Sequence, residues 1–180
     1  MVLSMNVNAI LLVGCLLVPP LANASEFGNV YGSPEIENAS RQASASALEA
    51  IENILRGLRE RESQQGNGSE QFRAAADLLL QARTVFGRLL DMPDLPDRPI
   101  SEPEASRLVA GMNSEFVAAS IRRAKTTKVL LFELQEQSGA LAEVLGAVAD
   151  SRQPIYPQIS ARLRDYMALA EVVTVVNRPR

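Results

Sequence analysis

The stretch SPEIENASRQASASALEAIENILRGLRERESQQGNG, residues 33–68, sets the fold class of this chain. Ser33, Pro34 and Glu35 mark a helix start, because a capping hydroxyl, a proline in the first turn and an early carboxylate all suit a helix N-terminus. Apolar residues then recur in steps of three and four: Ile36, Ala39, Ala43, Ala47, Ile51, Ile54 and Leu58. This spacing predicts one long helix with a buried face, and the polar, glycine-bearing residues 64–68 predict the turn that ends it.

The same periodicity predicts a second helix that begins at a cap formed by Asn67 or Ser69. Its buried stripe consists of Phe72, Ala76, Leu79, Ala82, Phe86 and Leu89. The helix is predicted to end before MPDLPDRP, residues 92–99, since prolines remove backbone donors and disfavour α geometry in the residue before them. We interpret this segment as a stiff crossover between two helical hairpins. The alternative is a boundary between two small domains.

A third helix is predicted to begin at Ser101, which forms a capping box with Glu104. Its apolar stripe comprises Leu108, Met112, Phe116, Ala119, Thr126, Val129 or Leu130, and Leu134. An unbroken helix from there to Asp150 would span about 70 Å, longer than its partners could cover, so a kink is predicted at Ser138–Gly139. After the kink the stripe continues with Leu141, Val144, Leu145 and Val148. Ala142 and Gly146, four residues apart, predict a notch for close packing.

Pro154 and Pro157 precede a last helix, whose stripe is Ile159, Leu163, Tyr166, Ala170 and Val173. The β-branched residues 172–176 would favour a strand in isolation. A single short strand without a partner leaves its backbone groups unpaired, so this segment is predicted to be the end of the helix. The predicted fold is all-α, a four-helix bundle or a close variant with a kinked long third helix, and residues 25–180 form a single helical domain.

Residues 1–24 have a different composition from the rest of the chain. From Ala9 to Ala22 twelve of fourteen residues are apolar or proline, and Ala22-Asn23-Ala24 is a small-x-small cleavage site. This pattern predicts a signal peptide and a periplasmic or secreted protein. Leu12-Val13-Gly14-Cys15 also matches a bacterial lipoprotein site, and lipidation of Cys15 would make the protein a membrane-anchored lipoprotein. The apolar run is too short for a transmembrane helix.

Composition excludes most catalytic chemistries. The chain has no histidine, and Cys15 is its single cysteine, so the exported part has no disulfide, no thiol or imidazole nucleophile, and none of the usual zinc, copper or haem ligand sets. A di-iron carboxylate site fails for the same reason. Two acid pairs, Glu102 with Glu104 and Asp94 with Asp97, have the residue types for glycoside hydrolysis. Acids at a helix start or in a proline-rich loop are usually structural, so neither an enzyme nor a cofactor is predicted.

The 18 basic and 21 acidic residues give a net charge of −3, which argues against a nucleic-acid partner. Locally, Arg122, Arg123, Lys125 and Lys128 fall within seven positions. On one continuous helix Arg122, Lys125 and Lys128 would lie within an arc of about 120°. This basic stripe is interpreted either as a solvated face balanced by acids on neighbouring helices, or as a docking patch for an acidic partner or an anionic surface.

These features predict an exported, non-enzymatic helical module that binds an envelope or secreted protein through exposed helix faces. The alternative is a carrier or sensor that holds a small apolar or anionic ligand between its helices, and a cavity lined by the apolar stripes would favour it. Membrane contact is expected only if Cys15 is lipidated.

Overall fold

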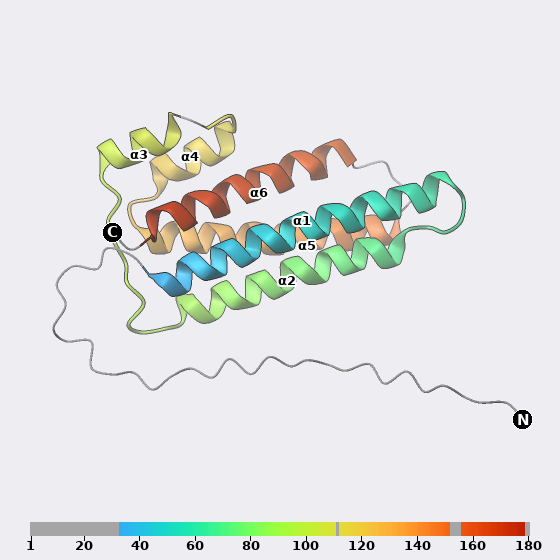
Figure 1. Cartoon of the computed structure of the whole chain (residues 1–180), viewed down its shortest axis with the longest axis horizontal. Coiled ribbons are helices and arrows are strands. Elements are labelled where there is room, and N and C mark those ends of the chain that lie inside the picture. The colour runs from blue at the N-terminus through green and yellow to red at the C-terminus, as the bar shows by residue number, and fades with distance from the viewer. Residues whose placement is uncertain (1–32, 111, 152–155, 179–180) are drawn as a thin grey trace, which may run out of the picture.

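A computed structural model describes residues 33–110, 112–151 and 156–178. Within these residues the chain forms six helices and no strand, so the all-α prediction is confirmed (Figure 1). In chain order they are α1 (Pro34–Glu62), α2 (Ser69–Leu90), α3 (Glu102–Val109), α4 (Glu115–Arg123), α5 (Thr127–Asp150) and α6 (Tyr156–Val176).

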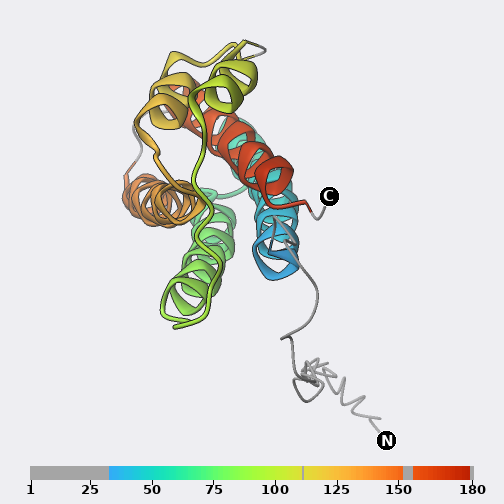
Figure 2. The same cartoon turned by 90° about the vertical axis from the view of Figure 1, so that its left-hand side faces the viewer.

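The four long helices lie alongside one another, and the two short ones form a hairpin at one side of them. Helix α2 packs against α1 and α5, and α6 packs against α1 and α5. Figure 2 shows α3 and α4 outside the long helices, next to α6, and α4 contacts both α6 and α5. The buried apolar side chains form one cluster, and its members come from the helices before and after the proline-rich segment, residues 92–99. The crossover therefore connects elements that share a core.

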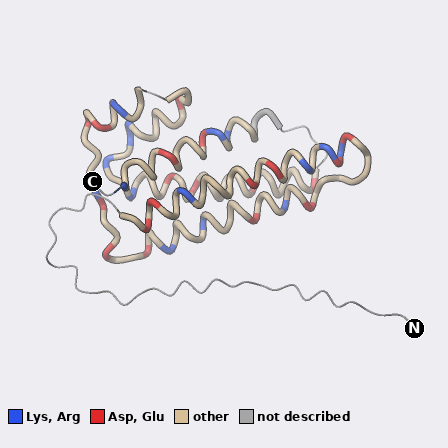
Figure 3. Tube along the Cα trace, in the orientation of Figure 1, with Lys and Arg blue, Asp and Glu red and all other residues tan. Residues whose placement is uncertain are grey.

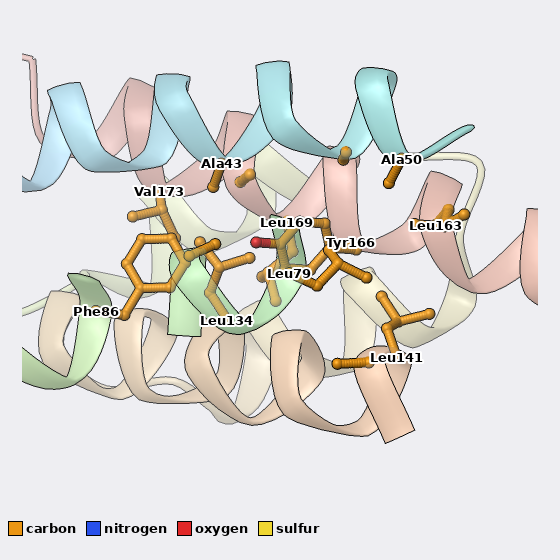
Figure 4. Close-up of a cluster of buried hydrophobic side chains, with 14 of the residues drawn as sticks. Ala43, Ala50, Leu79, Phe86, Leu134, Leu141, Leu163, Tyr166, Leu169 and Val173 are labelled. Atoms are coloured by element: carbon orange, nitrogen blue, oxygen red, sulfur yellow. The ribbon is translucent and has the colours of Figure 1, made fainter. Parts of the chain in front are cut away.

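The start of α1 agrees with its sequence signal. Ser33 is the N-cap, its side chain accepts a hydrogen bond from the Ile36 N–H, and Pro34 occupies the first helical position. The predicted alanines of α1 are buried, together with Ala50. Alanine adds little bulk to this face of α1, and Figure 4 shows Ala43 and Ala50 pointing into the buried cluster.

Most of the predicted core is buried. The largest members include Phe72, Leu79, Phe86, Leu134, Leu141, Leu163 and Tyr166, several of which meet in Figure 4. Each such side chain contributes about 1.5–3 kcal/mol when it is fully removed from water. Ile51, Leu58 and Leu89 pack at the edge of this core and are partly buried. The β-branched residues 172–176 are helical, as predicted.

The prediction of one kinked third helix is wrong. The described residues of this segment form three helices: α3 ends at Val109, α4 runs over Glu115–Arg123, and α5 begins at Thr127 and continues unbroken through Ser138 and Gly139. At the first break Ser114 starts a new helix, because its side chain accepts from the Val117 N–H. The new helix buries Val117 and Ile121 and turns Phe116 outward, so the prediction that Phe116 is a core residue is also wrong: it is 37% exposed.

Two further local predictions are corrected. The N-cap of α2 is Gly68, while Asn67 accepts the Ser69 N–H with its side-chain oxygen. The predicted packing notch fails at Gly146, where an added Cβ would have no atom of another element within 4 Å. The close glycine contact on this helix is at Gly139 instead, where a Cβ would lie 3.0 Å from the Arg83 guanidinium.

Ser138 and Tyr166 form a polar contact inside the core. Their hydroxyl oxygens are 3.0 Å apart, and the Ser138 hydroxyl also lies 2.8 Å from the Leu134 carbonyl oxygen. Both residues are almost fully buried. The pairing satisfies groups that would otherwise cost free energy in an apolar interior. Burial raises the pKa of the Tyr166 phenol to about 12, because the ionised form would lose its hydration.

We expect this phenol to make the protein less stable in strong base. Tyr166 titrates near pH 10 when unfolded and near pH 12 when folded, so above pH 10 the unfolded state releases a proton that the folded state retains. Two pKa units correspond to about 3 kcal/mol of stability lost between pH 10 and pH 12. Urea unfolding of wild type and Tyr166→Phe across this range measures the effect. Parallel pH profiles for the two proteins would contradict it.

Candidate functional site

The segment between α2 and α3 pairs with the segment between α4 and α5. The Thr127 N–H donates to the Arg98 carbonyl at 2.9 Å, and the Ile100 N–H donates to the Lys125 carbonyl at 2.9 Å. The Arg98 N–H donates to the Thr127 hydroxyl oxygen at 3.1 Å. These bonds form an isolated antiparallel bridge between Pro99 and Thr126. The bridge ties both ends of the α3–α4 hairpin together.

The Arg98 side chain connects this bridge to α3 and α6 through hydrogen bonds. Its two terminal nitrogens donate to the two carboxylate oxygens of Glu104 at 2.7 and 2.8 Å, and one of them also donates to the Val176 carbonyl at 3.0 Å. The paired side chains are only 18% and 13% exposed. The hydrogen bond to Glu104 raises the pKa of the Arg98 guanidinium, despite the opposing effect of burial. A bidentate ion pair of this kind holds the two side chains in a defined relative orientation.

Two side chains in this region cap helix starts. Ser101 accepts the Glu104 N–H, which confirms the predicted cap, while the Glu104 carboxylate binds Arg98. Asp97 accepts the Lys128 N–H at 3.1 Å, so it stabilises the first turn of α5 from 31 positions earlier in the chain. The acids Glu104 and Asp97 therefore bind groups of the protein itself. This observation favours the structural interpretation of these residues over the hydrolytic one.

A pocket of about 600 Å³ lies between α3 and α4. Its apolar wall includes Ile100, Ala105, Val109 and Ala124, and its polar wall includes Arg122, Lys125 and Glu102. Ile100 and Ala124 are almost fully buried, so they form a fixed apolar base. The pocket can accept an apolar side chain, and its two cations favour a negative charge beside that side chain.

The structure separates the four residues of the predicted basic stripe. Arg122 and Arg123 end α4, Lys125 lies in the linker, and Lys128 is in the first turn of α5. The predicted arc is wrong, because the chain leaves the helix at residues 124–126 to pair with the segment at Arg98. Arg122 and Lys125 are nevertheless brought together as lining residues of the α3–α4 pocket.

Acids lie close to two of these cations. An Arg122 nitrogen is 3.2 Å from a Glu115 oxygen, and an Arg123 nitrogen is 3.1 Å from a Glu133 oxygen. Glu133 also accepts from the Ser120 hydroxyl, so Arg123 is held against α5. Residues of both charge signs are spread over the described helices (Figure 3). Both arginines are thus balanced by an acid, Arg122 while it also lines the α3–α4 pocket, and the pocket's other cation is Lys125.

Sequence reasoning missed Arg98, and it named Asp97 only as a possible acid partner of Asp94, not as a group that caps a helix. Both residues lie in the segment that we interpreted as a stiff crossover. One available signal was the position of two charged side chains, Asp97 and Arg98, directly between Pro96 and Pro99. Prolines limit the backbone conformations of such a segment, so charged side chains within it are presented in defined positions.

No family model matches the chain, and neither do curated proteins or solved structures. The described helices include none long and apolar enough to cross a membrane. Among the residues with described positions, no three acids gather in a way that could hold a metal ion. The predicted signal peptide, residues 1–24, and its Cys15 lie outside the described residues, as does Pro154.

Proposed function

We propose that this protein is an exported, non-enzymatic interaction module that binds an envelope or secreted protein. In this proposal α1, α2, α5 and α6 form a four-helix bundle, and the α3–α4 hairpin is its docking arm. The single observation that carries the proposal is the α3–α4 pocket, which combines an apolar base with Arg122 and Lys125. The lack of histidine throughout the chain supports a role in binding over one in catalysis.

The pocket indicates the chemistry of the partner. An apolar side chain would bury its surface against Ile100 and Val109, and a neighbouring carboxylate would lie beside Arg122 and Lys125. Glu102 also lines the pocket and would repel a carboxylate placed on its own side. Phe116 is a further exposed apolar side chain on α4, but it does not line the pocket. An acidic-apolar segment of a partner protein fits these features.

Export rests on residues 1–24, and we propose cleavage after Ala24 that releases residues 25–180 into the periplasm or the medium. The alternative is processing at Cys15, which would tether the same helices to a membrane. Mass spectrometry of the N-terminus separates the two. Ser25 at the N-terminus supports the soluble form, an acylated Cys15 supports the lipoprotein, and an intact chain in the cytosol contradicts both.

We expect charge reversal in the pocket to abolish docking. In the double variant Arg122→Glu, Lys125→Glu, capture of the crosslinked partner from native envelopes should fall at least about tenfold, which corresponds to about 1.4 kcal/mol. The reason is that both cations facing the bound carboxylate become repulsive. Quantitative mass spectrometry of the crosslinked material measures the loss.

The matched control is Arg107→Glu, Lys128→Glu. It makes the same change in net charge on α3 and α5, but neither residue lines the pocket. The Arg107 side chain is exposed. Lys128 donates to Asp97 through its backbone N–H, so replacing its side chain leaves this hydrogen bond at the start of α5 in place. Equal losses in the two variants, or none in either, would count against docking at the pocket.

A further inference from the structure

The outward side of α5 exposes apolar side chains. Phe132 is 54% exposed, the highest value among the large apolar side chains of the described residues, and Val129 is 44% exposed. At about 100° per residue, both lie in an arc of about 80° with four further exposed residues. Figure 2 shows α5 at one edge of the described helices. We call this set the α5 face: Val129, Phe132, Glu136, Ala140, Glu143 and Ala147.

The charges at the two ends of α5 oppose its helix dipole. Lys128 lies in the first turn and Asp150 is the last residue, while the helix has no acid of its own in the first turn and no base in the last. The reverse arrangement stabilises a helix, because its N-terminus is partly positive and its C-terminus partly negative. These two charges therefore do not stabilise α5 alone. They complement a second α5 that runs in the opposite direction.

In such an antiparallel pair, Lys128 of each copy would lie beside Asp150 of the other. Asp150 is 70% exposed, and its ion pair with Arg73 is also exposed, so its carboxylate can accept a second cation. Steps forward along one helix match steps backward along the other. The pairing therefore puts Gly139, halfway between the two charged residues, at the middle of the contact.

This register brings the exposed aromatic ring against open space. Phe132 lies seven residues before Gly139, so it would face Gly146 of the other copy, seven residues after Gly139. An added Cβ at Gly146 would have no atom of another element within 4 Å, so the surface there has room for a ring. Ala147 borders the same space with a small side chain. Two-fold symmetry repeats this contact at both ends of the pair.

The middle of the contact carries charges of both signs. Arg83 of α2 reaches over α5 at Gly139, where an added Cβ would lie 3.0 Å from its guanidinium. Glu136 and Glu143 lie about one turn to either side of Gly139. In the antiparallel pair each guanidinium would lie among carboxylates of both copies, which favours association of this face with itself.

We propose that the α5 face is the interface of a weak, antiparallel homodimer. The 24 residues of α5 span about 36 Å, and a strip about 15 Å wide along them buries about 500 Å² on each copy. This area is typical of weak, transient complexes. The four central carboxylates outnumber the two guanidiniums, which also limits the affinity, so we expect a micromolar dissociation constant. The dimer does not depend on the function proposed for the α3–α4 pocket.

Thiol crosslinking tests the register, because residues 25–180 contain no cysteine. Ala140→Cys places a thiol next to the middle of the contact, so a short bismaleimide should join two copies. Ala147→Cys is the matched control on the same face. Its two thiols would lie about 24 Å apart along the helices, beyond the reach of the reagent. Equal crosslinking of the two variants, or none of either, would overturn the proposed dimer.

Sedimentation equilibrium of residues 25–180 measures the association itself. Wild type should pass from monomer to dimer as its concentration rises through the micromolar range. Phe132→Asp should weaken the dimer at least about tenfold. Leu48→Asp, which changes a 53% exposed apolar residue on α1, should leave it unchanged. Circular dichroism verifies that each variant is folded.

A charge exchange tests the pairing of the helix ends. Asp150→Lys alone should weaken the dimer, and the double variant Lys128→Asp, Asp150→Lys should restore it, because each cation again faces an acid. A chain that stays monomeric at submillimolar concentration, equal weakening by Phe132→Asp and Leu48→Asp, or no restoration by the double variant would contradict the proposal. Crosslinking of Ala140→Cys to a different envelope protein in place of the second copy would identify another occupant and also overturn it.

Discussion

Gly68→Ala is expected to destabilise the protein by about 3 kcal/mol or more. Gly68 has a φ of +66°, a conformation that residues with a Cβ rarely adopt, and an added Cβ would lie 2.3 Å from the Gly57 carbonyl oxygen. That atom belongs to the α1 backbone, so the clash can be relieved only if α1 and α2 move apart. For a chain of this size the melting temperature should fall by about 10 °C.

Gly146→Ala is the control for this experiment and should raise the stability of the protein. Gly146 lies inside α5, and an added Cβ would meet no atom of another element within 4 Å. Alanine is favoured over glycine inside a helix by about 0.5–1 kcal/mol, so the melting temperature should rise by about 2 °C. Thermal unfolding followed by circular dichroism measures both variants. A mild effect of Gly68→Ala would contradict the close α1–α2 contact.

Arg98→Ala is expected to cost about 3 kcal/mol and to loosen the α3–α4 hairpin. The substitution removes the two bonds to Glu104 and the bond to the Val176 carbonyl, and it leaves a largely buried carboxylate without this guanidinium. Breaking one side of a buried ion pair is costly because the remaining charge keeps its desolvation penalty. Urea unfolding gives the loss of stability, and hydrogen exchange should show faster exchange in α3 and α4.

Arg123→Ala is the comparison, because it removes an ion pair of similar length with Glu133. Its arginine side chain is 68% exposed, so the expected cost is below about 1 kcal/mol. A double-mutant cycle of Arg98→Ala with Glu104→Ala measures the coupling of the buried pair directly. Similar costs for Arg98→Ala and Arg123→Ala would show that the Arg98 contact does not hold the hairpin.

Local signals in the sequence predicted the helices whose ends depend on nearby residues. Ser33 and Pro34 start α1 by bonds and geometry within one turn, and the glycines near residue 67 separate it from α2. The apolar stripes of these helices, and of α6, match the buried faces because burial follows the helical period. The first break in the predicted third helix also had a local signal that we missed, in the turn-forming residues Asn113 and Ser114.

The second break could not be read from nearby residues. The stretch 124–126 contains neither glycine nor proline, and it leaves the helix because Lys125 and Thr127 bond to the segment at Arg98 and Ile100. The cap of α5 likewise comes from Asp97, far away in the chain. Since the α3–α4 pocket depends on these long-range contacts, the basic residues could be identified from the sequence while their arrangement could not.

The predicted kink failed for a related reason. Ser138 satisfies its hydroxyl with the Leu134 carbonyl and Tyr166, and Gly139 is covered by the Arg83 side chain. Both residues are compatible with a continuous α5, so their helix-weakening preferences are overridden by packing. The sequence suggested a bend where tertiary contacts instead required small side chains.

Site-specific photocrosslinking in the native envelope tests the central claim, docking at the α3–α4 pocket, most directly. One crosslinking amino acid replaces Ser106, which lines the pocket, and another replaces Asp77, which is exposed on α2. We predict a protein crosslink from position 106 and none from position 77, and loss of the crosslink when Arg122→Glu and Lys125→Glu are added. Crosslinks from position 77 alone, or a crosslink from position 106 that survives both substitutions, would contradict docking at this pocket.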